Sequence, residues 1–214
     1  MENLPIYISL IFGLTTILTA LIFFKASGNS KLVLIILLIW IDIQVFVGLS
    51  GFYTVTDTMP PRFLLLVLPP LLLVAFLFIT AKGKQFIDHL NIKHLTLLHT
   101  IRIPVELVLF WLCMNKAVPQ LMTFEGRNFD ILSGFTAPVV YYLGFVKKVL
   151  GRKVIIWWNI ICLGLLINIV FNAVFSAPFP FQKFAFDQPN IAILYFPFVW
   201  LPSCVVPLVL LSHL

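Results

Sequence analysis

Seven long apolar runs dominate the chain and limit what it can fold into. They cover roughly residues 5–24, 32–55, 61–81, 96–115, 130–147, 154–176 and 190–212. A helix rises about 1.5 Å per residue, so about 20 apolar residues are enough to cross the hydrocarbon core of a bilayer. Short connections that contain charges, Gly, Pro, Asn or Asp separate the runs. The pattern predicts an all-α fold, a polytopic membrane helical bundle of seven transmembrane helices.

Composition supports a membrane location and a single domain. Of the 214 residues, 61% are hydrophobic and 10% are charged, and the mean hydropathy is +1.09. An ordinary soluble domain is about 45–50% apolar and about 25% charged. Residues 1–214 are therefore expected to form one multi-pass domain of the plasma or inner membrane, with the lipid bilayer as its partner. The first run follows no basic segment and is longer than the core of a signal peptide, so we expect it to stay as an anchor.

The distribution of positive charge predicts the orientation. Nine Lys and Arg residues lie in the first, third and fifth connections, against four in the second, fourth and sixth. By the positive-inside rule, the N-terminus is expected outside and the C-terminus in the cytoplasm. Residues 82–90 of the third connection fit two interpretations: a short helix at the membrane surface, or an extension of span three or four.

Several classes of function lack support in the sequence. The net charge of +6 comes from residues in short connections, so we expect no nucleic-acid partner. Three cysteines, all inside apolar runs, indicate neither a disulfide framework nor a CxxC site. His89, His94 and His99 are spaced by five and do not share a helix face, so no metal site is expected. No phosphate-binding, dinucleotide-binding or GxSxG motif and no lysine in the last run appears, so we expect no cofactor.

The main candidates for a site are ionisable residues inside the apolar runs, where each costs about 2.5–3.5 kcal/mol or more at the bilayer centre. Asp42 and Glu106 each lie about 15 Å from the cytoplasmic edge by helical rise. Arg102 precedes Glu106 by four residues, about 40° away around the helix, so the two can pair. His99 extends the same stripe. If Asp42 faces it, two carboxylates and one guanidinium meet.

Three amides are further candidates. Gln44 points about 160° away from Asp42 on the same helix, so it serves either a binding site or a contact with another helix. Asn168 and Asn172 lie about 40° apart in the outer half of their span. They are expected either to bind a solute or to join two helices.

The outer connection between spans four and five is the most polar external stretch. Glu125, Arg127 and Asp130 lie in it. They form either a polar mouth over a central cavity or an ordinary solvated turn with weak surface ion pairs.

These residues favour a small-solute transporter or a solute-binding membrane protein with a charged cavity at mid-membrane. Glu106 or Asp42 would carry a proton, and Arg102 would hold its carboxylate partner or attract an anionic substrate. One alternative is an intramembrane lipid-modifying enzyme with His99 and Glu106 as acid or base, although the sequence offers no nucleophile or metal for it. The other is a non-catalytic scaffold or signalling partner. The sequence indicates no oligomeric state.

Overall fold

The computed structural model describes residues 4–214, and this part of the chain is all-α, 72% helical and without strands. The α-helices are α1 (Ile6–Ala26), α2 (Lys31–Leu49), α3 (Leu64–Ile79), α4 (Ala81–Asp88), α5 (Ile92–Leu98), α6 (Arg102–Met114), α7 (Ile131–Tyr141), α8 (Arg152–Ser176) and α9 (Val206–His213). Short 3-10 turns are η1 (Phe52–Thr54), η2 (His99–Ile101), η3 (Gln120–Met122) and η5 (Ala192–Leu194), and π turns are η4 (Tyr142–Val146) and η6 (Leu201–Val205). The predicted all-α fold is confirmed.

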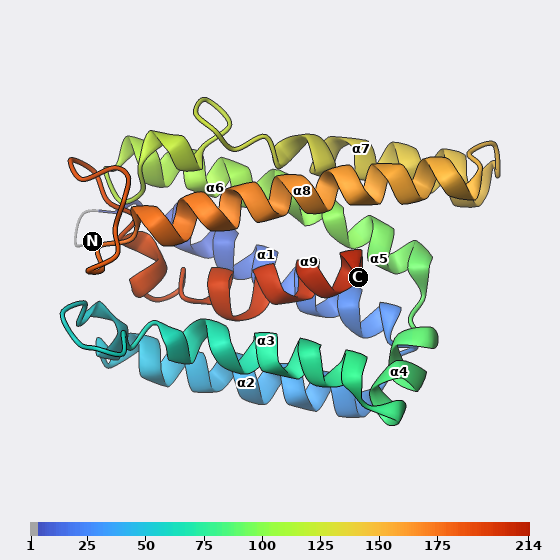
Figure 1. The fold of residues 1–214 in the computed structure, drawn as a ribbon, viewed down its shortest axis with the longest axis horizontal. Helices are drawn as coiled ribbons and strands as arrows, with labels where there is room; N and C mark the ends of the chain where they lie inside the picture. The colour runs from blue at the N-terminus through green and yellow to red at the C-terminus, as the bar shows by residue number, and fades with distance from the viewer. Residues whose placement is uncertain (1–3) are drawn as a thin grey trace.

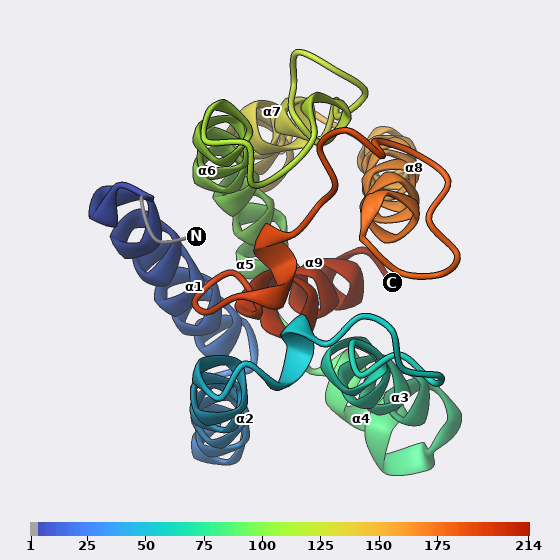
Figure 2. The ribbon, with the colours of Figure 1, turned by 90° about the vertical axis from the view of Figure 1, so that its left-hand side faces the viewer.

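The helices form a bundle around α9. Apart from α4, they lie side by side along the longest axis of the molecule (Figure 1). Seen from one end, α9 is in the middle, and the other long helices surround it (Figure 2). The surrounding helices expose many large apolar side chains on their outer faces, whereas most residues of α9 are buried. Apolar side chains thus lie on the outside of the bundle as well as in its core, which suits a bundle in lipid because lipid tails are as apolar as leucine.

Four helices are long and apolar enough to cross a membrane: α1, α2, the continuous helix Ile92–Met114 and α8. The pair α3 and α4 passes the same test together, which makes up to five candidate spans. The remaining two predicted spans, 130–147 and 190–212, contain shorter apolar helices, Ile131–Val146 and Leu201–His213.

The last run is only half helical, and a proline lies inside its helical part. Residues 195–199 form bends and turns, and the apolar helix spans Leu201–His213. Pro207 has no N–H, so the Ser203 carbonyl loses its partner one helical turn later. The Trp40 indole of α2 donates to that carbonyl at 2.8 Å. A side chain from a neighbouring helix thus replaces the missing backbone bond, as membrane helices with proline require.

The stretch 82–90 lies largely in a separate helix rather than in an extension of a span. Thr80 ends α3 and caps α4, with its hydroxyl accepting from the Gly83 amide at 3.1 Å. The two helices meet at 92°. A Cβ on Gly83 would fall 2.5 Å from the Leu77 Cα, so only glycine permits this sharp corner.

Candidate functional site

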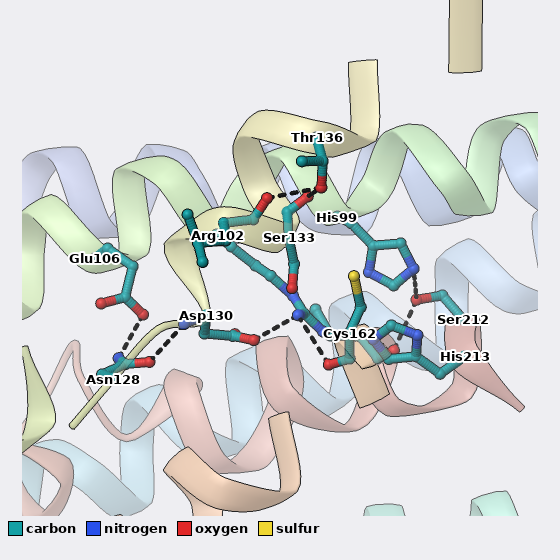
Figure 3. Close-up of polar contacts among 12 residues, drawn as sticks. His99, Arg102, Glu106, Asn128, Asp130, Ser133, Thr136, Cys162, Ser212 and His213 are labelled. Atoms are coloured by element: carbon teal, nitrogen blue, oxygen red, sulfur yellow. Dashed lines mark hydrogen bonds and ion pairs between the residues drawn. The ribbon is translucent and has the colours of Figure 1, made fainter. Parts of the chain in front are cut away.

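Polar side chains from four parts of the chain meet inside the bundle (Figure 3). They come from the η2 and α6 region, from residues 128–136, from α8 and from the end of α9. His99, Arg102 and Glu106 follow one another along η2 and α6, and each is at most 2% exposed. The predicted polar stripe therefore faces the interior of the bundle.

Arg102 is the centre of this network. Its Nη1 donates to Asp130 Oδ1 at 2.5 Å and to the Cys162 carbonyl at 3.4 Å. Its Nη2 lies 2.6 Å from His213 Nε2. The side chains of Arg102 and Asp130 are 3% and 7% exposed, so this is a buried ion pair.

The pair that helical spacing allows between Arg102 and Glu106 is not formed. No ion pair or hydrogen bond joins these two side chains within residues 4–214. Asp130, just before α7, pairs with the Arg102 guanidinium instead, and Glu106 accepts a hydrogen bond from Asn128. Helical spacing placed both residues on one face correctly, but the partners come from segments distant in sequence.

The bonds of His213 define its tautomer. Arginine has donors only, so His213 Nε2 must accept from Arg102 and carries no proton. The other ring nitrogen, Nδ1, lies 2.7 Å from Asn159 Oδ1 and therefore donates to it. Asn159 Nδ2 donates in turn to the His213 carbonyl at 2.7 Å. His213 is thus a neutral link between Arg102 and α8, which holds the end of α9 in place.

His99 stacks on His213 and contacts a serine. The two rings are 4.1 Å apart between centroids, at an interplanar angle of 22°. Ser212 Oγ lies 3.3 Å from His99 Nε2 and also donates to the Val209 carbonyl at 2.7 Å. His99 Nδ1 is buried and has no hydrogen-bond partner in residues 4–214.

Glu106 lies at the edge of a small cavity and is only partly satisfied. Asn128 Nδ2 donates to Glu106 Oε1 at 2.6 Å, whereas Oε2 is buried without a hydrogen-bond partner in the described chain. The cavity has a volume of about 100 Å³. Glu106 and Asp130 are the acidic residues that line it, and apolar side chains of α3, α6, α8 and the segment before α9 form the rest. Glu106, which carries this unpartnered oxygen, therefore lines a space large enough for a few waters or a small solute.

A glycine brings α7 close enough to complete the network. A Cβ on Gly134 would lie 2.8 Å from Ile103 Cγ1 and 3.1 Å from the Ile103 amide nitrogen. The backbones of α6 and α7 can therefore approach as in the small-residue contacts of membrane helices. This approach places Asp130, just before α7, beside Arg102.

Asp42 and Gln44 lie outside this network. Asp42 is exposed on α2 and forms no ion pair or hydrogen bond within residues 4–214, so it does not join Arg102 and Glu106. Gln44 is 1% exposed and accepts a hydrogen bond from the Tyr53 hydroxyl at 2.8 Å. The opposite orientation of these two side chains follows the helical geometry, and the bundle buries the neutral one.

The remaining candidates mostly hold the outer connection to α8. Asn168 Nδ2 donates to the Arg127 carbonyl at 2.8 Å, and Asn172 Nδ2 donates to the Asn168 carbonyl at 2.9 Å. Arg127 and Glu125 are exposed, with the Arg127 guanidinium 5.9 Å from the centre of the Phe184 ring. Of the three predicted mouth residues, Asp130 alone is buried and enters the network.

Sequence reasoning missed several members of the network, namely Asn128, Ser133, Asn159, Cys162, Ser212 and His213. Asn159 and His213 are polar residues near the ends of apolar runs, which is a signal that could have marked them. Asn128 lies in a turn, and nothing in its sequence context distinguishes it from a solvated residue. No group of three or more His, Cys, Asp or Glu residues in the described chain is arranged to hold a metal ion.

Comparison with known proteins places the network in a family of unknown function. No curated protein and no solved structure matches the chain. Residues 59–214 match a family described as "Domain of unknown function (DUF8737)". The match runs from just before α3 to the end of α9 and so includes every residue of the network around Arg102 and Glu106. By this match over most of its length, the chain belongs to the DUF8737 family.

Proposed function

We propose that the protein crosses the membrane seven times and binds a small solute for transport at the Glu106 cavity. Two arguments favour seven crossings over the four or five set by helix length. The helices α7 and α9 run alongside the longer helices (Figure 1), and each lies within an apolar run of roughly 20 residues. The basic connections then all fall on one side, with the N-terminus outside.

The unpartnered Glu106 Oε2 at the cavity is the single observation that carries the solute site. Arg102 is already balanced by Asp130, and the hydrogen bonds of His213 make it neutral. An ionised Glu106 therefore has no countercharge of its own. Burying such a carboxylate without enough donors is costly, so it favours a ligand that supplies an N–H donor or positive charge.

The cavity limits the size and character of that ligand. Its volume of about 100 Å³ is below the range of about 300–1,000 Å³ typical of sites for drug-sized molecules. Its walls are apolar apart from the carboxylates of Glu106 and Asp130. A small primary amine with a short aliphatic body fits both features, with its ammonium at Glu106. A proton taken up by Glu106 would satisfy the same oxygen between transport steps.

Thermal denaturation of the purified protein in detergent tests the site. The ligands are a series from methylamine to butylamine, with the corresponding amides, carboxylates and NaCl for comparison. A ligand that binds only the folded state raises its stability by mass action, by about 2.7 kcal/mol at 100 times Kd. We expect one amine to raise the melting temperature of the wild type and of Glu125→Gln, an exposed control. Glu106→Gln should remove this shift.

Transport itself needs a second readout. The amine that stabilises the protein should accumulate in proteoliposomes containing wild type, and Glu106→Gln should abolish uptake. If no amine shifts the melting temperature, or if Glu106→Gln responds like wild type, Glu106 is a structural residue. The scaffold interpretation would then be preferred, since every other charge in the network already has a partner.

One contact favours an intramembrane lipid-modifying enzyme as the second candidate. Ser212 Oγ lies 3.3 Å from His99 Nε2, a spacing just beyond that of a serine nucleophile and its base. Against it, no residue orients the other nitrogen of His99 in the described chain. A fluorophosphonate probe that labels wild type but not Ser212→Ala would support the enzyme. Absence of labelling in wild type would contradict it.

A further inference from the structure

A long apolar groove runs between α2 and α3 and is separate from the Glu106 cavity. Its volume is about 590 Å³, and the residues that line it come from α1, α2, α3, α4 and the η6 and α9 segment. Figure 2 shows α2 and α3 on one side of α9, whose buried face forms the floor. The groove and the cavity share no residue, so a ligand here would be independent of the proposed solute.

The length of the groove matches one leaflet of a bilayer. Along α2 it extends from Leu32, at the start of the helix, to Ile43. Eleven residues of helix at about 1.5 Å each correspond to about 16 Å. The hydrocarbon core of a bilayer is about 30 Å thick, so a leaflet provides about 15 Å. On α3 the groove spans Pro69 to Leu77, which is the half of that helix nearest α4.

A positive charge closes one end of the groove. Lys82, in the first turn of α4, is the charged residue among those that line it. Because α4 turns away from α3 by 92°, it crosses the end of the groove instead of extending along it. The Lys82 side chain is exposed and forms no ion pair within residues 4–214. The groove is thus apolar along its length and cationic at the end where a lipid headgroup would lie.

We propose that the groove binds an anionic phospholipid from the leaflet on the α4 side. One acyl chain occupies the space between α2 and α3, and the phosphate contacts the Lys82 ammonium. The apolar lining residues contact the acyl chain. The charge of Lys82 favours an anionic over a zwitterionic headgroup by attraction to the net charge of that headgroup.

Native mass spectrometry of protein purified with equimolar phosphatidylglycerol and phosphatidylcholine tests the proposal. Two substitutions fill the groove from opposite walls, Leu73→Trp and Ile36→Trp. Each has a control one residue away that is exposed and does not line the groove, Leu72→Trp and Ile35→Trp. Wild type and both controls should retain one tightly bound phosphatidylglycerol, and both groove variants should lose it.

The headgroup has its own matched pair on α4. Lys82→Gln should lower the ratio of bound phosphatidylglycerol to phosphatidylcholine about fivefold, the effect of one basic residue near an anionic surface. Lys84→Gln, on the same helix but outside the groove, should leave the ratio unchanged. Equal lipid retention by both members of either Trp pair overturns the groove as the site. An unchanged ratio in Lys82→Gln overturns the anionic preference, and a wild type without bound lipid overturns the whole proposal.

Discussion

Arg102 draws its partners from three other segments of the chain: Asp130 before α7, Cys162 on α8 and His213 on α9. A buried pair of this kind adds little over well-packed apolar residues, but breaking it leaves a buried charge. Its value is therefore specificity of helix packing, because the two terminal nitrogens of Arg102 reach all three partners only when α6, α7, α8 and α9 are packed together.

A double-mutant cycle tests the contribution of the ion pair between Arg102 and Asp130. Asp130→Leu alone should lower the free energy of unfolding by about 3–5 kcal/mol, since it leaves Arg102 buried and uncompensated. Arg102→Leu should lower the free energy of unfolding by a similar amount, because it leaves the buried Asp130 carboxylate unpaired. The double variant Arg102→Leu, Asp130→Leu should recover most of the loss in thermal denaturation. Additive losses in the double variant would mean that the two side chains do not act as a pair.

Asp42 should be dispensable for both stability and solute binding. Its side chain is exposed and unpaired within residues 4–214, on the face of α2 opposite Gln44. Asp42→Asn should not lower the free energy of unfolding, because it removes an unpaired ionisable group from the outer face of a candidate span. Gln44→Leu, which breaks a buried hydrogen bond to Tyr53, should cost about 1–3 kcal/mol. Loss of solute stabilisation in Asp42→Asn would place Asp42 in the site after all.

Sequence reasoning could find the charged residues but could not choose their partners. The spacing of His99, Arg102 and Glu106 predicts one shared helix face, and all three are buried. Asp130, by contrast, precedes a span and looks like an ordinary solvated residue. Its burial depends on the approach of α7 to α6, which is a tertiary property that no local pattern contains.

Among the elements, α7 depends most on a single small residue. Gly134 packs against Ile103 so closely that an added methyl group needs backbone or side-chain movement. Gly134→Ala should therefore destabilise the protein by about 1–3 kcal/mol, the usual cost of overpacking. It should also weaken the Arg102 pair, because Asp130 moves with α7.

Gly164 on α8 is the matched control. Nothing lies within 4 Å of a Cβ built there, and the residue is in the middle of a helix. Gly164→Ala should therefore be neutral or stabilising by about 0.5–1 kcal/mol through helix propensity alone. Both variants can be compared by thermal denaturation in the same detergent. A Gly134→Ala protein as stable as Gly164→Ala would contradict the close packing of α6 and α7.

The elements also show where hydropathy stops being informative. Apolar runs predict where long helices lie, and α1 and α8 match their predicted runs to within two residues at each end, whereas α2 ends at Leu49, six residues before the end of its run. Hydropathy does not predict which part of an apolar run is helical. The run 190–212 is also apolar, but its first half, which contains Pro197, forms short turns instead of a continuous helix.

At the scale of the whole molecule, the short helix α9 lies at the centre of the bundle. The other helices surround the sides of α9 (Figure 2), and most of its residues are buried by protein. Non-helical backbone at membrane depth is tolerated where protein buries it. Residues 192–194 and 198–199, in the non-helical half of the last run, are buried.

Seven crossings and an outside N-terminus make a specific prediction for the ends of α7 and α8. Single cysteines at Glu125 and Lys183 should react with a membrane-impermeant maleimide in intact cells, whereas cysteines at Lys84 and Lys148 should react only after permeabilisation. All four positions are exposed, and the native cysteines are buried or half-buried, so the unsubstituted protein provides the background. If Glu125→Cys and Lys148→Cys react from the same side, α7 does not cross. The positive charges would then no longer lie on one side, and the orientation argument would fail with the crossing number.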